Sequence, residues 1–174
     1  LVGEAVADYR GEASEPEPEM KIELAVDAHL PGDYVESERL RLEIYKRLAS
    51  VREETDLDAV RDELLDRYGP LPEQVENLFG VARFRLLCRS VGITEVLSAG
   101  TMVRFSPAVL AESRELRRQR LYPGSRVNKA MAQLFLPRPM TRPIAGRPLT
   151  DGPLLEWATQ AVTALFVSEP AQVA

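Results

Sequence analysis

The side chains that could carry out catalytic chemistry are few in this sequence. His29 and Cys88 are the single histidine and the single cysteine, and they lie far apart in the chain. Zinc clusters and Cys–His nucleophiles need several such residues close together, so neither is expected. No glycine-rich loop followed by Lys-Ser or Lys-Thr is present, which argues against a P-loop nucleotide site. We therefore predict a chain that is not an enzyme, with no catalytic residue, metal ligand or cofactor-binding residue, and interpret both residues as structural.

Carboxylates are abundant, but they fall on predicted amphipathic helices rather than around a cleft. In the helix predicted over 56–68, Asp58, Asp62 and Asp66 follow at four-residue spacing, where like charges repel by about 0.2–0.5 kcal/mol per pair. Asp62, Glu63 and Asp66 are predicted to point away from the apolar stripe of that helix. The residues alone favour a solvated acidic face, and a patch that binds Arg or Lys of a partner is the alternative.

Basic residues gather in the second half of the chain. Residues 101–150 carry ten Lys or Arg and two acidic residues, a local charge of +8 in a chain of net charge −5. Arg114, Arg117, Arg118 and Arg120 are the candidate nucleic-acid contacts, because cations neutralise phosphate. Few aromatic residues interleave with them and no nucleic-acid-binding module is recognisable, so pairing with the acidic half is equally plausible. We expect at most weak, salt-sensitive DNA binding through them.

The elements that position these residues follow from the spacing of apolar side chains. Alternation of Ile22, Leu24 and Val26 predicts a strand, and a period near 3.6 predicts helices after it. The predicted strands span 20–27, 95–98, 102–105, 126–128 and 133–136, and the predicted helices span 37–51, 56–68 and 72–92, with a short one from Ser106 to Arg120 and a last one from Asp151. The fold class is therefore α+β (α/β mixed): an N-terminal strand and a three-helix segment packed with a small, mostly antiparallel sheet and a C-terminal helix.

Three finer predictions rest on local patterns. Thr55 with Asp58 resembles a capping box at the start of the second helix. Leu42, Tyr45 and Ala49 form a second apolar stripe on the first helix, which predicts that this helix is sandwiched between neighbours. The segment 137–148 holds four prolines and is expected to be irregular.

The chain is expected to divide into a linker, one domain and a tail. Residues 1–19 have the acidic, proline-spaced composition of a linker. A single regulatory domain is predicted over 20–168, with a helical half (20–93) and a sheet-containing half (94–168), followed by a tail over 169–174. The start at Leu1 rather than Met suggests a fragment of a longer protein. The lone cysteine favours a reducing, cytoplasmic compartment, and no apolar run reaches the ~18 residues of a membrane span.

Two motifs resemble one known family. SERLRLEIYKRLAS over 37–50 and ELLDRYGPLPEQVENL over 63–78, at this separation, resemble the C-terminal domain of the bacterial transcription-repair coupling factors, the Mfd family. The resemblance is strong over 20–93 and weak over 94–174, where 137–148 departs from the family pattern. It implies a bacterial, cytoplasmic parent: an ATP- and Mg-dependent double-stranded DNA translocase, related to helicases. In nucleotide excision repair such a parent displaces stalled RNA polymerase and recruits UvrA.

The resemblance also implies a role for this domain, which carries none of the motor motifs. Family members use it for autoinhibition: it docks intramolecularly on the parent's UvrB-like module and masks the surface that UvrA binds. The E-L-[LI]-D motif of the docking helix transfers here as Glu63 and Asp66, with Asp62 beside them, and it moves the acidic face from solvent to interface. The alternatives are an accessory nucleic-acid-binding module in 101–150 and a structural cap on the motor.

Overall fold

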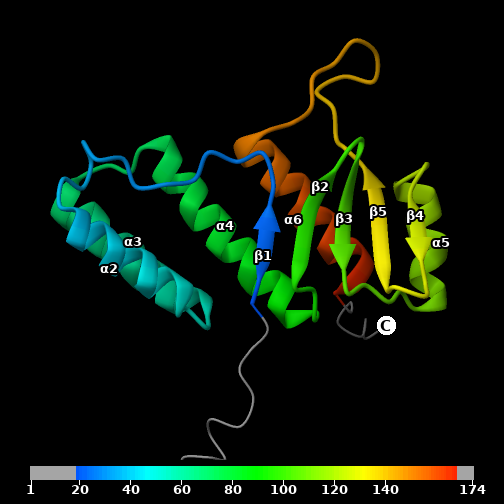
Figure 1. The fold of residues 1–174 in the computed structure, drawn as a ribbon, viewed down its shortest axis with the longest axis horizontal. Helices are drawn as coiled ribbons and strands as arrows, with labels where there is room; N and C mark the ends of the chain where they lie inside the picture. Colours follow the sequence, from blue (N-terminus) through cyan, green and yellow to red (C-terminus); the bar gives the residue numbers. More distant parts are fainter. Residues whose placement is uncertain (1–18, 168–174) are drawn as a thin grey trace, which may run out of the picture.

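The computed structural model describes residues 19–167, and within them the chain forms five helices and one five-stranded sheet (Figure 1). In chain order the elements are β1 (Lys21–Glu23), α2 (Glu38–Ala49), α3 (Glu54–Tyr68), α4 (Glu73–Ser90), β2 (Glu95–Ala99), β3 (Met102–Ser106), α5 (Glu112–Leu121), β4 (Arg126–Asn128), β5 (Gln133–Pro137) and α6 (Asp151–Phe166). The predicted α+β class is confirmed. The linker predicted over 1–19, apart from Glu19, and the tail over 169–174 lie outside the described residues.

The sheet has the strand order β1-β2-β3-β5-β4. β1 pairs in parallel with β2, and the other neighbours are antiparallel. Alternate residues point to opposite faces of a sheet. One face packs under α4 and α6 and carries the buried side chains of Val96, Val103, Phe105, Leu134 and Leu136. Figure 1 shows the opposite face of the strands turned toward the viewer, with no described helix across it.

Helix α4 joins the two halves of the domain because it is apolar on two sides. Val75 and Phe79 pack with α2 and α3 in one cluster, whereas Phe84 and Cys88 pack with α6 and the sheet in a second cluster. The helices α4 and α6 approach closely at Gly80, where an added Cβ would lie 3.0 Å from Leu155 Cδ1. A side chain at Gly80 would therefore require the end of the Leu155 side chain to shift.

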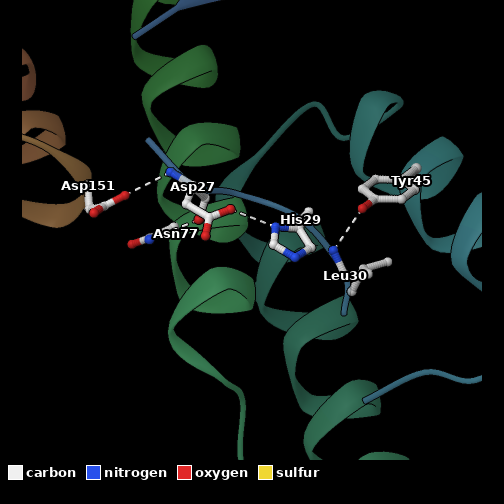
Figure 2. Close-up of polar contacts among 6 residues, drawn as sticks. All are labelled: Asp27, His29, Leu30, Tyr45, Asn77 and Asp151. Atoms are coloured by element: carbon white, nitrogen blue, oxygen red, sulfur yellow. Dashed lines mark hydrogen bonds and ion pairs between the residues drawn. The ribbon is translucent and has the colours of Figure 1, made fainter. Parts of the chain in front are cut away.

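The segment after β1 runs as a strap across the helices (Figure 2). The Asp27 backbone N–H donates to Asp151 Oδ1 of α6 at 2.7 Å, and Asn77 Nδ2 of α4 donates to the Asp27 carbonyl oxygen at 3.1 Å. Asn77 is 7% exposed, so its amide is one of the few buried polar groups among the described residues. A buried amide needs such a partner, because an unmade hydrogen bond leaves its desolvation uncompensated.

The same strap reaches α2. The Leu30 backbone N–H donates to Tyr45 Oη at 2.7 Å, and His29 Nδ1 lies 2.7 Å from Asp27 Oδ1 (Figure 2). His29 is thus a hydrogen-bonded structural residue, as its place beside a turn predicts. The strap therefore connects α2, α4 and α6, helices that are far apart in sequence, through a hydrogen bond to each.

Removing the Asn77 amide tests the strap. Asn77→Ala leaves the Asp27 carbonyl without its donor, and we expect the free energy of unfolding to fall by about 1–2 kcal/mol. Urea denaturation followed by circular dichroism measures the change. Gln119→Ala, which removes an exposed amide on α5, is the matched control and should cost no more than ~0.5 kcal/mol. Equal losses in the two variants would show that the strap bond adds nothing.

Three local predictions were wrong in detail. Helix α3 starts at Glu54 and is capped by Glu53, whose side chain accepts from the Asp56 N–H while Asp56 accepts from the Glu53 N–H. The capping box therefore lies two residues before the predicted Thr55 start. β1 is shorter than 20–27, because the chain leaves the sheet edge after Glu23 to become the strap.

The third error concerns α2, which is not sandwiched by the described residues. Leu42 is 54% exposed and Ala49 is exposed as well, while Tyr45 is half-buried against the strap. Of the three residues in the second apolar stripe of α2, only Tyr45 is covered by other described residues.

In the sheet-containing half, the observed elements lie at the ranges predicted from the sequence, except for the start of α5. The two hairpin strands and β4 and β5 lie where they were predicted, but α5 begins at Glu112 rather than near Ser106. The segment 137–148 is irregular yet held by backbone hydrogen bonds, such as Thr141 N–H to the Arg147 oxygen at 2.8 Å. It forms the loop that projects beyond the sheet, orange in Figure 1.

Between residues 19 and 167, no helix has the length and apolar character needed to cross a membrane.

Candidate docking surface

Two ion pairs hold α3 against α4. Arg61 donates to both carboxylate oxygens of Glu76 at 2.6 and 2.9 Å, and Arg83 donates to Glu54 at 2.7 Å. The hydrogen bonds from Arg61 lower the pKa of Glu76 and raise the pKa of Arg61 in turn. Exposed pairs of this kind contribute about 0–1 kcal/mol each. The rotation of α3 about its axis is set mainly by its buried stripe of Leu57, Val60 and Leu64.

With that rotation set, one side of α3 faces away from the core. Asp58, Asp62 and Asp66 are exposed, and Leu65 beside them is 48% exposed. We call these four residues the α3 outer face. In residues 19–167, the carboxylates of Asp62 and Asp66 are held by no hydrogen bond or ion pair. The helix ends at Gly69, whose φ of 85° favours glycine.

Glu63 does not share this face. Its carboxylate forms an ion pair with Arg47 of α2, and the Glu63 side chain is 39% exposed. Glu63 lies off the apolar stripe, as predicted together with Asp62 and Asp66, but its carboxylate is turned toward α2 rather than to the side opposite the core. The structure places Asp62 and Asp66 together and turns Glu63 toward α2. Partner binding by these residues stays a prediction.

The Arg47–Glu63 contact joins the two motifs that carried the family resemblance, 37–50 and 63–78. Sequence reasoning missed Arg47 as part of this surface, because a periodicity does not show which helix lies alongside. It also missed Leu65, although a signal was present. Leu65 lies off the buried stripe of Leu57, Val60 and Leu64 and is an apolar residue without a place in the core.

Two of the predicted nucleic-acid contacts serve the C-terminus of α6. Arg114 donates to the carbonyl oxygens of Ala164 at 2.7 Å and Val167 at 2.8 Å, and Arg117 donates to Ala164 at 3.0 Å. The last carbonyls of a helix have no partner within the helix and carry partial negative charge, so arginines suit this position. These guanidinium groups are thus engaged within the domain.

A third predicted contact is buried. Arg118 is 9% exposed and donates to Glu115 at 2.8 Å and to Ser125 Oγ at 2.7 Å, which holds the turn that follows α5. Arg120 is the exposed member of the predicted set. The four arginines therefore do not form a common free surface, and nucleic-acid binding through them stays a prediction with less support than before.

The model of the TRCF domain family matches residues 24–115, a range that contains both motifs. The chain belongs to the TRCF domain family. It is 42% identical to the transcription-repair-coupling factors of Mycobacterium bovis and Mycobacterium tuberculosis over 95% of its length. It is 35% identical to that of Staphylococcus haemolyticus over 61% of its length. The chain spans 14% of the mycobacterial relatives and 9% of the staphylococcal one.

A solved structure agrees with the fold of this TRCF domain. The crystal structure of a C-terminal domain of transcription-repair coupling factor superposes with a TM-score of 0.61 at 16% identity, covering 83% of this chain and 94% of that one. At this identity the likeness concerns the fold alone. With the family match, it confirms the resemblance to the C-terminal domain of transcription-repair coupling factors.

Proposed function

We propose that this chain is the non-catalytic, autoinhibitory domain of a transcription-coupled repair translocase. In this proposal it docks on the UvrB-like module of its own parent through the α3 outer face and so masks the UvrA-binding surface. ATP, magnesium, double-stranded DNA and RNA polymerase are then handled by the parent's other domains. The observation that carries the proposal is a helix, packed on α2 and α4, that among the described residues presents Asp62 and Asp66 without partners beside the exposed Leu65.

The chemistry of this face specifies its partner. Two carboxylates one turn apart suit a surface that offers Arg or Lys, and Leu65 adds apolar area at the centre of the contact. Rim ion pairs contribute only about 0–1 kcal/mol each, so such a contact is weak when the two parts are separate. A tether supplies an effective concentration of order millimolar, which keeps a weak contact mostly closed. Opening then exposes the UvrA-binding surface by a shift of population.

Glu63 has a different place in the proposal. Its carboxylate already pairs with Arg47, so a cation of the partner would have to share that carboxylate with Arg47. Glu63 therefore lies at the margin of the proposed contact. We expect Glu63→Ala alone to weaken docking less than Asp66→Ala does.

Charge reversal on the α3 outer face tests the proposal in the full-length parent. Asp62→Lys/Asp66→Lys should raise the affinity for UvrA by about tenfold or more, since like charges then face each other across the contact. Glu63→Ala/Asp66→Ala should raise it less. Binding is measured by surface plasmon resonance against immobilised UvrA, with a parent truncated before Met20 as the fully open reference.

The matched control is Glu38→Lys/Glu43→Lys on α2, which makes the same change of charge at two exposed positions away from α3. It should leave UvrA binding at the wild-type level. If truncation releases UvrA binding but reversal on α3 behaves like the control, the docking face lies elsewhere. If truncation has no effect either, the autoinhibitory role is wrong and the structural cap takes its place.

A further inference from the structure

The open face of the sheet carries one row of residues across four strands. Leu97 pairs with Arg104, Arg104 with Phe135, and Phe135 with Arg126, so these side chains lie on the same face in neighbouring strands. Their neighbours along each strand, such as Val96 and Leu134, are buried under the helices. Phe135 is half-buried, and none of the row belongs to either buried cluster. An aromatic ring thus lies between two arginines, each one strand spacing of roughly 4.8 Å away.

Charge divides this face into two ends. The β1–β2 end contains Glu23 and Glu95 together with Lys21, which pairs with Glu23, whereas the β3–β5–β4 end and the residues that follow its strands contain the bases Arg104, Arg126, Lys129 and Arg138. The two acidic residues of 101–150, Glu112 and Glu115, both belong to α5, and Glu115 is bound by Arg118. The β3–β5–β4 end is therefore positive even though the whole chain is acidic.

The guanidinium of Arg104 is only partly paired within the described residues. Arg104 Nε is buried without a hydrogen-bond partner among the described residues, and Arg104 Nη2 lies 3.5 Å from Glu95, at the limit of a hydrogen bond. A depression of about 620 Å³ at β4 and β5 is lined by Arg126, Val127, Asn128, Lys129 and Phe135. Depressions of this size hold small-molecule ligands in other proteins. An aromatic ring, an amide and two cations line this one.

We propose that the β3–β5–β4 end of the open sheet face binds single-stranded nucleic acid. A base stacks on Phe135, Arg104, Arg126 and Lys129 contact the phosphates, and the Asn128 amide lies within reach of a base edge. A ring on a sheet can stack only on a base that is free of its own duplex, which selects single strands. The carboxylates of an acidic protein could pair with these cations equally well, but they would not stack on an aromatic ring placed between the cations, as a base does.

This proposal is independent of the docking role. It uses β3, β4 and β5, whereas docking uses α3, so each can fail without the other. It narrows the alternative drawn from the sequence, a nucleic-acid-binding module in 101–150, to Arg104, Arg126 and Lys129. Arg114, Arg117 and Arg118 take no part in it.

The test is fluorescence anisotropy of a fluorescein-labelled twelve-residue oligothymidylate titrated with the full 174-residue chain. We expect a Kd of about 10⁻⁴–10⁻⁶ M at physiological salt. Arg126→Ala/Lys129→Ala should weaken binding by about tenfold and flatten the slope of log K against log salt by about 0.7 for each phosphate that is no longer neutralised. Arg39→Ala/Lys46→Ala on α2 removes the same charge at two exposed positions and should leave binding unchanged.

Phe135 variants separate stacking from charge. Phe135→Leu keeps apolar bulk but loses the ring and should weaken binding by roughly 5- to 30-fold, whereas Phe135→Tyr should bind like wild type. Circular dichroism checks that each variant is folded. Equal binding by the leucine and tyrosine variants would overturn the proposal, as would tighter binding of a duplex of the same length. Stronger binding of a polyglutamate peptide than of the oligonucleotide would instead assign the surface to an acidic protein.

Discussion

Replacing Phe84 with alanine should lower the free energy of unfolding by about 3–5 kcal/mol, the usual cost of removing a large aromatic side chain from a core. Phe84 is 2% exposed on α4 and belongs to the cluster between the helices and the sheet. Its loss leaves a cavity among side chains that the sheet holds in place, so collapse can fill little of it. Urea denaturation followed both by circular dichroism and by the fluorescence of Trp157, which packs on the same cluster, measures the change.

The two probes also test whether the halves 20–93 and 94–168 unfold together. Because α4 contributes to both clusters, we expect both transitions to shift by the same amount. Leu116→Ala, at a position 69% exposed on α5, is the control and should cost less than ~0.5 kcal/mol. A shift in Trp157 fluorescence alone would mean that the halves unfold separately and that α4 does not couple them.

Cys88 should be almost unreactive in the folded protein. Burial raises the pKa of its thiol to about 12, and its side chain is fully enclosed beneath the sheet. A free cysteine has a pKa near 8.5, so at pH 8 the thiolate fraction falls by roughly a thousandfold. The thiolate is the reacting form, and reaction with Ellman's reagent should slow by at least that factor. In denaturant the rate should return to that of a free thiol.

The same shift makes stability depend on pH in one direction. The unfolded chain releases the Cys88 proton as pH rises above about 8.5, while the folded chain keeps it until about pH 12. The ionisation of Cys88 therefore leaves the free energy of unfolding unchanged below about pH 8.5 and lowers it as the pH rises from there to about 12. Cys88→Ala should remove this part of the alkaline decline. A native reaction rate within tenfold of free cysteine would contradict the burial of this residue.

The two proposed surfaces differ in charge and in the elements that carry them. The α3 outer face is acidic and belongs to the helical half, while the β3–β5–β4 end of the sheet is basic and belongs to the other half. The acidic and basic parts of the sequence meet where Glu95 of β2 pairs with Arg104 of β3. The ion pairs of α3 form with α2 and α4, within the helical half.

The sequence by itself determined the elements and the family. The periods of apolar residues placed the five helices and the five strands of the described chain, because burial on one side of a helix or strand imposes that period directly. The motifs over 37–50 and 63–78 identified the family because their spacing is specific. Start and end residues were less certain: Thr55 is the better N-cap residue by type, yet the helix is capped by Glu53 in a reciprocal capping box with Asp56.

Tertiary structure alone decided which surfaces are free. A helical period shows that Glu63 and Asp66 lie off the core stripe, but not that Arg47, 16 residues earlier, lies beside Glu63. In the same way Arg114 looks like a solvent-exposed cation until α6 places the Ala164 carbonyl, 50 residues away, against it. The open face of the sheet follows from the packing of both α4 and α6 on the opposite face. Local sequence sets which residues share a face, whereas long-range packing sets what that face meets.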